Sequence, residues 1–370
     1  MPYDVIVSGH LCADLIPEMP GTSLSALAAP GKLFEVGPLT IATGGVVSNT
    51  GSALHRLGIE VGMMTIIGDD LLGNVILAGL KERDSRFGNL IKVCKNQSSS
   101  YSIIFSPEDA DRVIFHYPGN NALFDITDIN FEVIRDTKIF HFGYPPVLPR
   151  LYASEGESLL AVYRRIHEMG VLTSLDMCHP DAGGPSGQVN WRRILQRVLP
   201  YVDIFLPSIE EIVFMMRRAD YDRWQGDVLR HLTHAYVRDL AGELLSMGVT
   251  MTGFKLGEYG FYIRTAGESA AFTRFAVLPF QTAEWQNLDL WHPAFVVKVV
   301  GTIGAGDCAY GGFLAALLRG LKPQATLRFA CAVGASNVEA ADATSSVRSW
   351  DDTLARIEQG WAVSTDQLPD

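Results

Sequence analysis

The sequence lacks the features that mark a nucleic-acid-binding, disulfide-stabilised or membrane-spanning protein. Its 30 lysines and arginines are outnumbered by 41 aspartates and glutamates, and no basic cluster stands out that could replace the counterions of a phosphate backbone. The five cysteines are odd in number and form no Cys-x-x-Cys pair, which argues against a disulfide framework and a zinc site. Apolar runs such as 294–300 are too short to cross a bilayer. We therefore expect neither a nucleic-acid nor a membrane partner.

The first residues also lack the charged and apolar regions of a secretory signal peptide, so we expect the protein in the reducing cytoplasm. What the sequence does contain is 48% hydrophobic and 19% charged residues, the ordinary balance of an enzyme with a large core. Its 370 residues exceed the rough prior of about 150 per domain. One large domain with a small addition fits that length as well as two domains do.

Short β-rich runs alternate with helical patterns over most of the chain. Near-continuous apolar strands separated by amphipathic helices are what a parallel sheet covered on both faces requires. The expected strands are 5–7, 61–67, 138–142, 171–175, 202–206 and 251–255, and the expected helices are 157–169, 227–247, 305–318 and 323–341. The predicted fold class is therefore α/β.

The segment 90–115 breaks this alternation because it contains strand-like runs without a long helix. The runs are 90–93, 101–105 and 112–115, and turn-forming residues 106–111 join the last two. Such a hairpin is compatible with a small lid and equally with an antiparallel edge added to the main sheet.

The most informative stretch is a strand that leads into Gly304-Ala305-Gly306-Asp307, where a helix opens. Glycines let the backbone approach a ligand, and the first amides of a helix have no partner within it, so the turn is a ready anion site. An aspartate beside such a site can accept a proton from a hydroxyl that attacks phosphorus. The helix amino terminus also favours the ionised form of that carboxyl group.

Two other interpretations of this turn stay open from the residues alone. Gly304-x-Gly306-x-x-Ala309 fits the relaxed dinucleotide-binding fingerprint. That fingerprint, however, normally opens a domain and has an acidic residue about twenty positions later, which Leu327 and Arg328 do not supply. A simple helix cap by Asp307 is as well supported as catalysis. A Walker loop is excluded because no Gly-Lys-Ser/Thr follows.

Two separated motifs resemble those of the ribokinase-like (PfkB) carbohydrate kinases. Residues 302–307 resemble the motif D-T-x-G-A-G-D, and Gly44-Gly45 followed by Asn49 resembles the amino-terminal glycine pair, with Gly58 and Gly68 at the expected spacing. Weaker similarity covers essentially the whole chain. The resemblance implies a three-layer sandwich with a mostly parallel central sheet and a small β-lid. It divides the chain into a main α/β domain at 1–88 and 121–370 and a lid excursion at 89–120.

The resemblance also implies ATP-dependent phosphorylation of a hydroxyl group on a sugar or sugar-like molecule. Asp307 would be the general base, and Gly304, Ala305 and Gly306 would form the anion hole. Matching positions imply that the acceptor is bound by Asp14, Gly44, Gly45 and Asn49.

On the nucleotide side, residues 208–211 align with the family's N-x-x-E motif, so Ser208 and Glu211 would lie near the nucleotide and Glu211 would hold Mg²⁺ through water. The strand–turn 255–260 resembles the family's nucleotide-contacting turn, which implicates Lys255, Gly257 and Gly260. The lid would exclude water from the reaction. Its edge strand would also offer a pairing surface for a homodimer.

Departures from the family pattern keep alternatives open. Gly301 replaces the first aspartate of D-T-x-G-A-G-D, which removes the ground for expecting activation by K⁺. Ser208 replaces an asparagine, Gly51 replaces a small residue with a Cβ, and Asp342 stands where glycine is common. The alternatives are a nucleoside kinase on the same scaffold and a non-catalytic sugar- or nucleotide-binding regulator, with a nicotinamide oxidoreductase as a remote third.

Each supporting residue also has a purely structural interpretation. Asp14 fits a turn, Asn49 fits the cap of a helix at 52–57, and Glu211 fits a solvated charge in a first helical turn. For four further residues we expect interior packing: His141, Cys308, Trp285 and His292. The alternatives are an acid–base role for His141, a nucleophilic role for Cys308 and a flap over the nucleotide for the other two. The same choice applies to Trp291.

Overall fold

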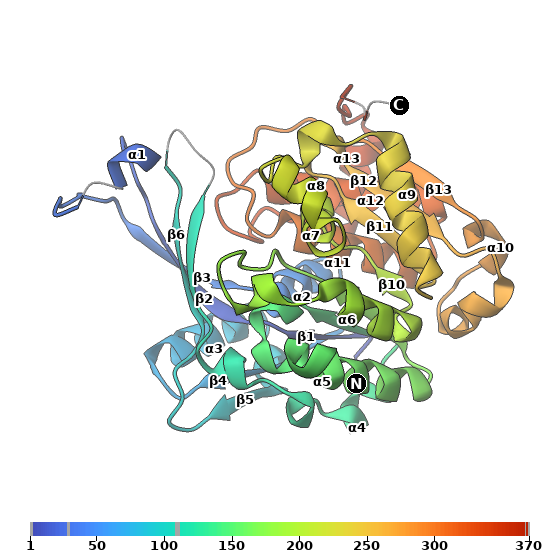
Figure 1. Cartoon of the computed structure of the whole chain (residues 1–370), viewed down its shortest axis with the longest axis horizontal. Coiled ribbons are helices and arrows are strands. Elements are labelled where there is room, and N and C mark those ends of the chain that lie inside the picture. Colours follow the sequence, from blue (N-terminus) through green and yellow to red (C-terminus); the bar gives the residue numbers. More distant parts are fainter. Residues whose placement is uncertain (1–2, 28–29, 108–111, 367, 369–370) are drawn as a thin grey trace.

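In the computed structural model, the central sheet has the strand order β13-β12-β11-β10-β9-β8-β1-β4-β5 (Figure 1). The structure describes residues 3–27, 30–107, 112–366 and 368. Pairing is parallel from β5 to β11 and antiparallel at β12 and β13. The strands are β1 (Val5–Gly9), β4 (Val61–Gly68), β5 (Ile91–Cys94), β8 (Ile139–Gly143), β9 (Leu172–Asp176), β10 (Ile204–Phe205), β11 (Met251–Lys255), β12 (Phe261–Thr265) and β13 (Asp289–His292).

These strands form where the sequence predicts them because both of their faces are covered. Every residue of β1, β4, β8, β9 and β11 is buried. Successive side chains point to opposite faces of a strand, so Val5 and Val7 of β1 belong to one hydrophobic core and Ile6 to the other. The predicted α/β class is confirmed.

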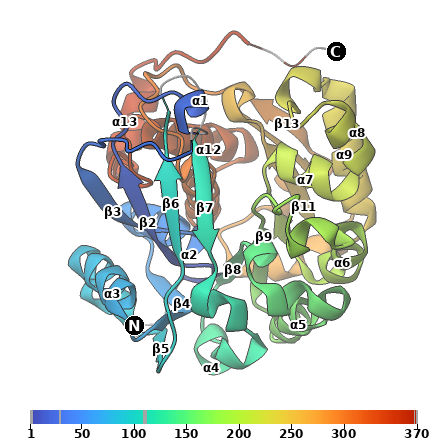
Figure 2. The ribbon, with the colours of Figure 1, turned by 60° about the vertical axis from the view of Figure 1, so that its left-hand side comes forward.

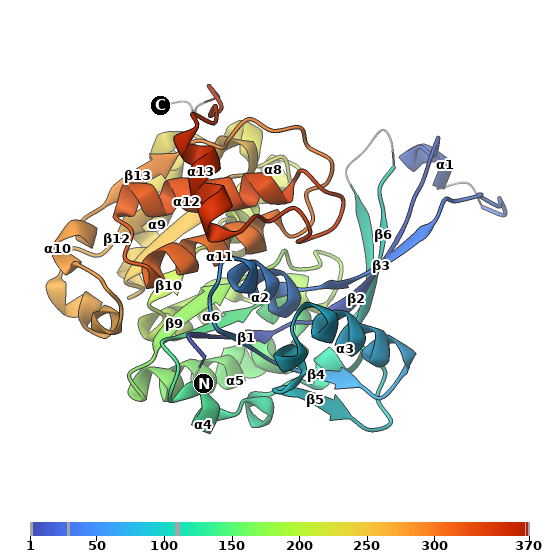
Figure 3. The same ribbon diagram turned by 180° about the vertical axis from the view of Figure 1, so that it is seen from behind.

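Two helical layers cover the sheet, as the opposite views in Figures 1 and 3 show. One layer packs on the core that contains Val5 and consists of α2 (Val46–Arg56), α3 (Leu71–Arg83), α11 (Ala305–Leu318), α12 (Pro323–Asn337) and α13 (Trp350–Glu358), joined by α10 (Thr282–Trp285). The other packs on the core that contains Ile6 and consists of α4 (Phe131–Ile134), α5 (Pro149–Glu168), α6 (Trp191–Val198), α7 (Ile209–Met216), α8 (Arg218–Arg223) and α9 (His234–Ser246).

The predicted helix bounds need three corrections. The helix expected over 227–247 begins only at His234, because the Thr233 side chain accepts from the amide of Tyr236 and caps it there. The helix expected over 157–169 extends back to 149 as α5, with non-helical backbone at 153–156. The helix expected to reach residue 341 ends at Asn337. Among the described residues, no helix is both long and apolar enough to cross a membrane.

A smaller sheet projects from this body (Figure 1), and Figure 2 shows its strand order, β3-β2-β6-β7. It consists of β2 (Cys12–Pro17), β3 (Leu39–Gly44), β6 (Tyr101–Phe105) and β7 (Val113–Tyr117), and the short helix α1 (Leu24–Leu27) follows β2. The predicted hairpin supplies only β6 and β7, and its connecting residues 108–111 lie outside the described residues. The other two strands come from residues before the expected excursion 89–120. Strand β5, inside that excursion, pairs with β4 in the main sheet.

Candidate active site

Asp307 lies in the first turn of α11, which begins at Ala305. Gly304 caps the helix in the left-handed region at φ 72°, and a Cβ there would lie 2.8 Å from the Cβ of Ala343. Only glycine adopts this conformation without strain. The buried Tyr310 further along α11 donates its hydroxyl to the carbonyls of Leu175 and Ile204. The helix amino terminus is thereby held against the carboxyl ends of the parallel strands, which is where α/β proteins bind ligands.

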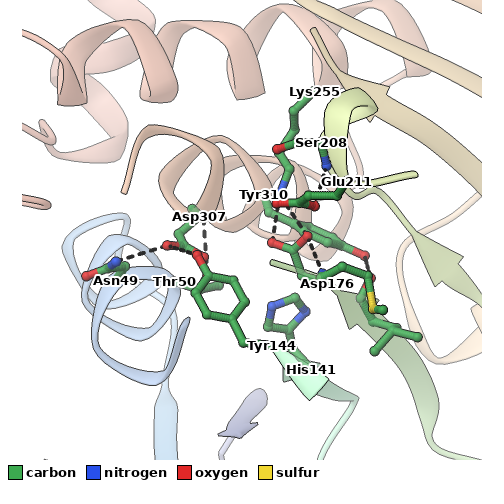
Figure 4. Close-up of polar contacts among 12 residues, drawn as sticks. Asn49, Thr50, His141, Tyr144, Asp176, Ser208, Glu211, Lys255, Asp307 and Tyr310 are labelled. Carbon is green, nitrogen blue, oxygen red and sulfur yellow. Dashed lines mark hydrogen bonds and ion pairs between the residues drawn. The ribbon is translucent and has the colours of Figure 1, made fainter. Parts of the chain in front are cut away.

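One oxygen of the Asp307 carboxylate accepts two side-chain hydrogen bonds (Figure 4). Oδ2 accepts a hydrogen bond from the amide of Asn49 at 2.9 Å and another from the hydroxyl of Tyr144 at 2.8 Å. Thr50 donates to the backbone carbonyl of Asp307 at 3.3 Å. The side chain is 2% exposed, and within the described part of the chain Oδ1 has no hydrogen-bond partner. Oδ1 is therefore the oxygen that can accept a proton from a ligand.

The basicity of this carboxylate reflects opposing influences. Burial raises the pKa of Asp307, because a charge loses hydration in the interior. The ammonium group of Lys255 and the hydrogen bonds from Asn49 and Tyr144 lower it, and the net direction is upward. A carboxylate with a raised pKa is a stronger base than a solvated aspartate.

The glycine pair at 44–45 brings Asp14 and α2 close to Asp307. Helix α2 begins at Val46 with Gly45 as its cap, so Asn49 lies within the first turn, and the interpretation of Asn49 as the cap of a helix at 52–57 is wrong. Gly45 has φ 85°, and a Cβ on Gly44 would lie 2.0 Å from Oδ2 of Asp14. Side chains larger than hydrogen would displace the carboxylate.

Asp14 belongs to strand β2 and is 6% exposed, so the turn interpretation of this residue is wrong. Its Oδ1 accepts from the thiol of Cys12 at 3.2 Å. Burial raises the pKa of Asp14 to about 6, and the charge of Asp307 contributes in the same direction. The two carboxylates therefore lie within electrostatic range of each other.

A lysine–carboxylate cluster occupies the other side of the Gly-rich turn. Nζ of Lys255, at the end of β11, lies 2.7 Å from both oxygens of Asp176 at the end of β9. A Cβ on Gly306 would lie 3.4 Å from that Nζ, which places the cation beside the turn. Burial lowers the pKa of Lys255, but Asp176, Glu211 and Asp307 offset this and raise it overall. The lysine is therefore charged.

Ser208 and Glu211 begin α7 next to this cluster (Figure 4). They form a capping box, in which the amide of Ser208 donates to Oε2 of Glu211 at 2.9 Å. Burial raises the pKa of Glu211, and Lys255 opposes that change. Glu211 is thus a partly buried capping residue in the first turn of α7 that also interacts with the lysine.

Gly257 and Gly260 follow Lys255 in a tight turn. Both have positive φ, 56° and 91°, and a Cβ on Gly260 would lie 2.1 Å from the carbonyl oxygen of His292. Trp291 and His292 belong to strand β13 beside this turn, and Trp285 is 1% exposed in the core. Packing roles therefore hold for these aromatic residues.

The structure adds two residues that the sequence analysis did not assign to the site, Tyr144 and Asp176. Each directly follows or ends a parallel strand, and that position was the available signal. Tyr144 has φ 69°, a strained value for a side chain other than glycine, and such strain concentrates at functional sites.

His141 and Cys308 have the packing roles that the sequence predicts. His141 is fully buried with Nδ1 against the Ser174 hydroxyl at 2.8 Å, and burial lowers its pKa to about 3. Burial raises the pKa of the Cys308 thiol, so it is not an activated nucleophile.

A family model described as pfkB family carbohydrate kinase matches residues 3–350. The 2-dehydro-3-deoxygluconokinase of Bacillus subtilis (strain 168) is 24% identical over 310 residues, covering 84% of this chain and 85% of that protein. Fructokinase-2 of Oryza sativa subsp. japonica is 24% identical over 314 residues, covering 85% and 79% respectively. The structure of the Xylella fastidiosa fructokinase with bound ATP superposes with a TM-score of 0.71 at 18% identity, covering 96% of this chain and 99% of that chain.

Proposed function

The chain belongs to the pfkB family of carbohydrate kinases, and from that premise we propose that it transfers the γ-phosphoryl group of ATP to a hydroxyl group of a sugar or sugar-like molecule with Asp307 as general base. The chain has the ribokinase-like sandwich of the kinase structure it resembles. The observation that carries the proposal is the buried Asp307 carboxylate, whose Oδ1 stays unpaired beside a helix amino terminus.

On the acceptor side, Asn49 and Tyr144 hold Oδ2 and leave Oδ1 to take the hydroxyl proton. The acceptor would lie between this oxygen and Asp14, with the Gly44–Gly45 backbone against it. Proton removal by a positioned base typically contributes about 10²–10⁴-fold to the rate.

On the nucleotide side, the amides of Ala305 and Gly306 in the first turn of α11 would bind the transferring phosphoryl group. Lys255, held by Asp176, adds a positive charge next to Gly306. Phosphoryl transfer depends mainly on positioning and on stabilising charge over the equatorial oxygens. We assign the turn at Gly257–Gly260 and residue Ser208 to nucleotide binding on their position beside this cluster.

The proposal includes Mg²⁺, held mostly by the phosphates. Among the described residues, no three His, Cys, Asp or Glu side chains form a group that could hold a metal ion. Glu211 and Asp176 fit an indirect role, because both carboxylates lie around Lys255 at the phosphate side and would bind waters of the ion. When bound, Mg²⁺ would supply positive charge that offsets the negative charge of the phosphates.

We further propose a homodimer formed through the small sheet, which would act as a lid. Apolar side chains are exposed on its two edge strands: Leu39, Ile41, Ile114, Phe115 and Tyr117. Exposed apolar edge strands are natural pairing surfaces.

The test of the catalytic assignment is Asp307→Asn. Measured by ADP release with Mg·ATP and an acceptor found by screening, kcat should fall by about 10²–10⁴-fold, while ATP binding by calorimetry changes little. Asp203 is unsuitable as a control because it is fully buried. The control is Asp222→Asn, which changes an exposed aspartate that pairs with Arg218 and should retain wild-type kcat. Near-normal turnover of Asp307→Asn would refute the assignment. ATP binding without turnover on any acceptor would favour the regulator.

A further inference from the structure

A set of uncharged polar side chains lies next to the proposed acceptor site, and the family motifs do not include them. We name His10, His116 and Asn121 the histidine cluster. His10 follows β1, His116 belongs to β7 of the small sheet, and Asn121 belongs to the short helix Gly119–Leu123. The amide nitrogen of Asn121 lies 2.8 Å from Nδ1 of His10 and donates to the carbonyl of Leu11 at 2.8 Å. The two imidazole rings meet edge to face with centroids 5.0 Å apart.

The histidine cluster is continuous with the catalytic carboxylate on one side. The His10 ring stacks on Tyr144 at 6.0 Å, and Tyr144 donates to Asp307. A Cβ on Gly45 would lie 2.8 Å from the His10 ring. The glycine motif and the histidine cluster therefore border the same region.

The cluster also reaches Asp14 through the small sheet. Nδ1 of His116 lies 3.2 Å from the hydroxyl of Ser102, which lies 3.7 Å from the thiol of Cys12. That thiol donates to Asp14. His116 thus links the lid to the carboxylate that faces the acceptor.

Several atoms around this region are buried and have no partner among the described residues. They are Nε2 of His116, Oδ1 of Asn121, Oδ1 of Asn49, both amide atoms of Asn120 and Oδ1 of Asp307. Buried polar atoms are nearly always hydrogen-bonded in proteins. Such a concentration of open donors and acceptors suits a ligand that carries several hydroxyl groups.

The charge of the region disfavours an anionic acceptor. Within the described residues, the hydrogen-bond partners of the histidine cluster are neutral. Burial lowers the pKa of His10 and also that of His116, so neither ring supplies a positive charge at neutral pH. The ionised groups near this region include the carboxylates of Asp14 and Asp307, which repel anions.

Arg112 is the cation to weigh against this conclusion. Its guanidinium group contacts the hydroxyl of Thr302 in the turn that precedes Asp307, and its charge lowers the pKa of Asp14. The contact with Thr302 holds the guanidinium group at the Gly-rich turn that precedes Asp307. There it would compensate charge on the transferring group.

We propose, resting on the kinase function above, that the acceptor is a neutral polyhydroxylated sugar and that His116 is a specificity-determining residue whose Nε2 binds one of its hydroxyl groups. A sugar acid or sugar phosphate would place its anionic group near Asp14 or among neutral amides and imidazoles. Discrimination by buried polar groups is strong, because a mismatched ligand leaves them unpaired.

The first experiment compares acceptors with the full-length protein and Mg·ATP, measured by ADP release. The probes are fructose and ribose as neutral sugars, 2-dehydro-3-deoxygluconate as a sugar acid, and fructose 1-phosphate as a sugar phosphate. We expect kcat/KM for one neutral sugar to exceed that of both anions by at least about 100-fold. A preference for either anion would overturn the inference and leave the kinase function intact. Absence of turnover with every acceptor, nucleosides included, would refute the kinase function itself.

The second experiment tests His116 with the preferred neutral sugar. His116→Phe keeps the ring packing and removes Nε2, so KM for the sugar should rise at least about tenfold while KM for ATP stays within twofold. His116→Gln, which retains a polar end, should recover part of the loss. His231→Phe is the matched control, because this ring stacks on Trp224 in the segment between α8 and α9. An unchanged sugar KM in a folded His116→Phe protein would overturn the assignment, and a loss that His116→Gln does not relieve would do the same.

Discussion

Replacing Tyr144 with phenylalanine tests how the carboxylate of Asp307, our proposed base, is positioned. The change removes one of the two hydrogen bonds to Oδ2 of Asp307 and keeps the aromatic ring. A hydrogen bond to a charged group is worth about 1.5–3 kcal/mol. One pKa unit corresponds to about 1.4 kcal/mol, so the pKa of Asp307 should rise by about one to two units.

The sign follows from which form the hydroxyl stabilises. Tyr144 donates to the ionised carboxylate and lowers its pKa, so its removal makes protonation easier. The base works only when ionised, and the acid limb of the pH profile of kcat should therefore move to higher pH. Three other ionisable groups also act on Asp307 and keep their places in the variant: Lys255, Asp176 and Asp14.

The assay is ADP release across pH 5–9 with saturating ATP and acceptor. We expect kcat at neutral pH to fall by about tenfold or more, because the freed carboxylate loses orientation as well as ionisation. Tyr236→Phe is a matched control, since that hydroxyl donates to Asp220 at 2.9 Å outside the site. An acid limb that stays in place, with kcat within twofold of wild type, would refute the positioning argument.

Three further predictions concern charge, cations and assembly. Lys255→Met leaves Asp176 buried without its cation, so the free energy of unfolding should fall by about 3–5 kcal/mol at pH 8, whereas Lys138→Met at an exposed pair should cost less than about 1 kcal/mol. Burial raises the pKa of Asp176 to about 6 even with the lysine present. The loss of unfolding free energy in Lys255→Met should therefore shrink as the pH falls, because protonation of Asp176 removes the unpaired charge. A loss in urea unfolding at pH 5 that equals the loss at pH 8 would contradict this. Because Gly301 offers no side-chain oxygen, exchanging NaCl for KCl should change kcat less than twofold, and clear activation by K⁺ would show that other oxygens form a cation site. Phe115→Glu should convert a dimer to a monomer in light scattering, and a wild-type monomer at all concentrations would exclude the lid interface.

Much of the fold could be predicted from local pattern. The strands at 5–7, 61–67 and 251–255 appear at the expected places because parallel strands buried on both faces need continuous apolar runs. Helix α11 has the expected bounds because the Gly-rich turn before it is a strong start signal. These are local properties of consecutive residues.

The composition of the small sheet could not be predicted in the same way. Strand β2 pairs in parallel with β6, so that Ala13 lies opposite Tyr101. Neither strand contains a signal for the other, because pairing between distant segments depends on register rather than on local periodicity. The small sheet therefore takes two strands from before residues 89–120, whereas β5 pairs in the main sheet.

The same distinction between local pattern and contacts of distant segments applies to the candidate site. The sequence by itself determined that Asp307 would stand at a helix amino terminus, because a glycine-rich turn before a helix dictates that local geometry. The role of Asp307 as the base is our proposal. Only the tertiary structure brought Asn49 and Tyr144, 258 and 163 positions away, onto one oxygen of Asp307. It also brought the ammonium group of Lys255 into contact with the carboxylate of Asp176 and brought together the residues of the histidine cluster. Such contacts depend on the order of strands in the sheet and the directions of their side chains, which no local stretch of sequence specifies.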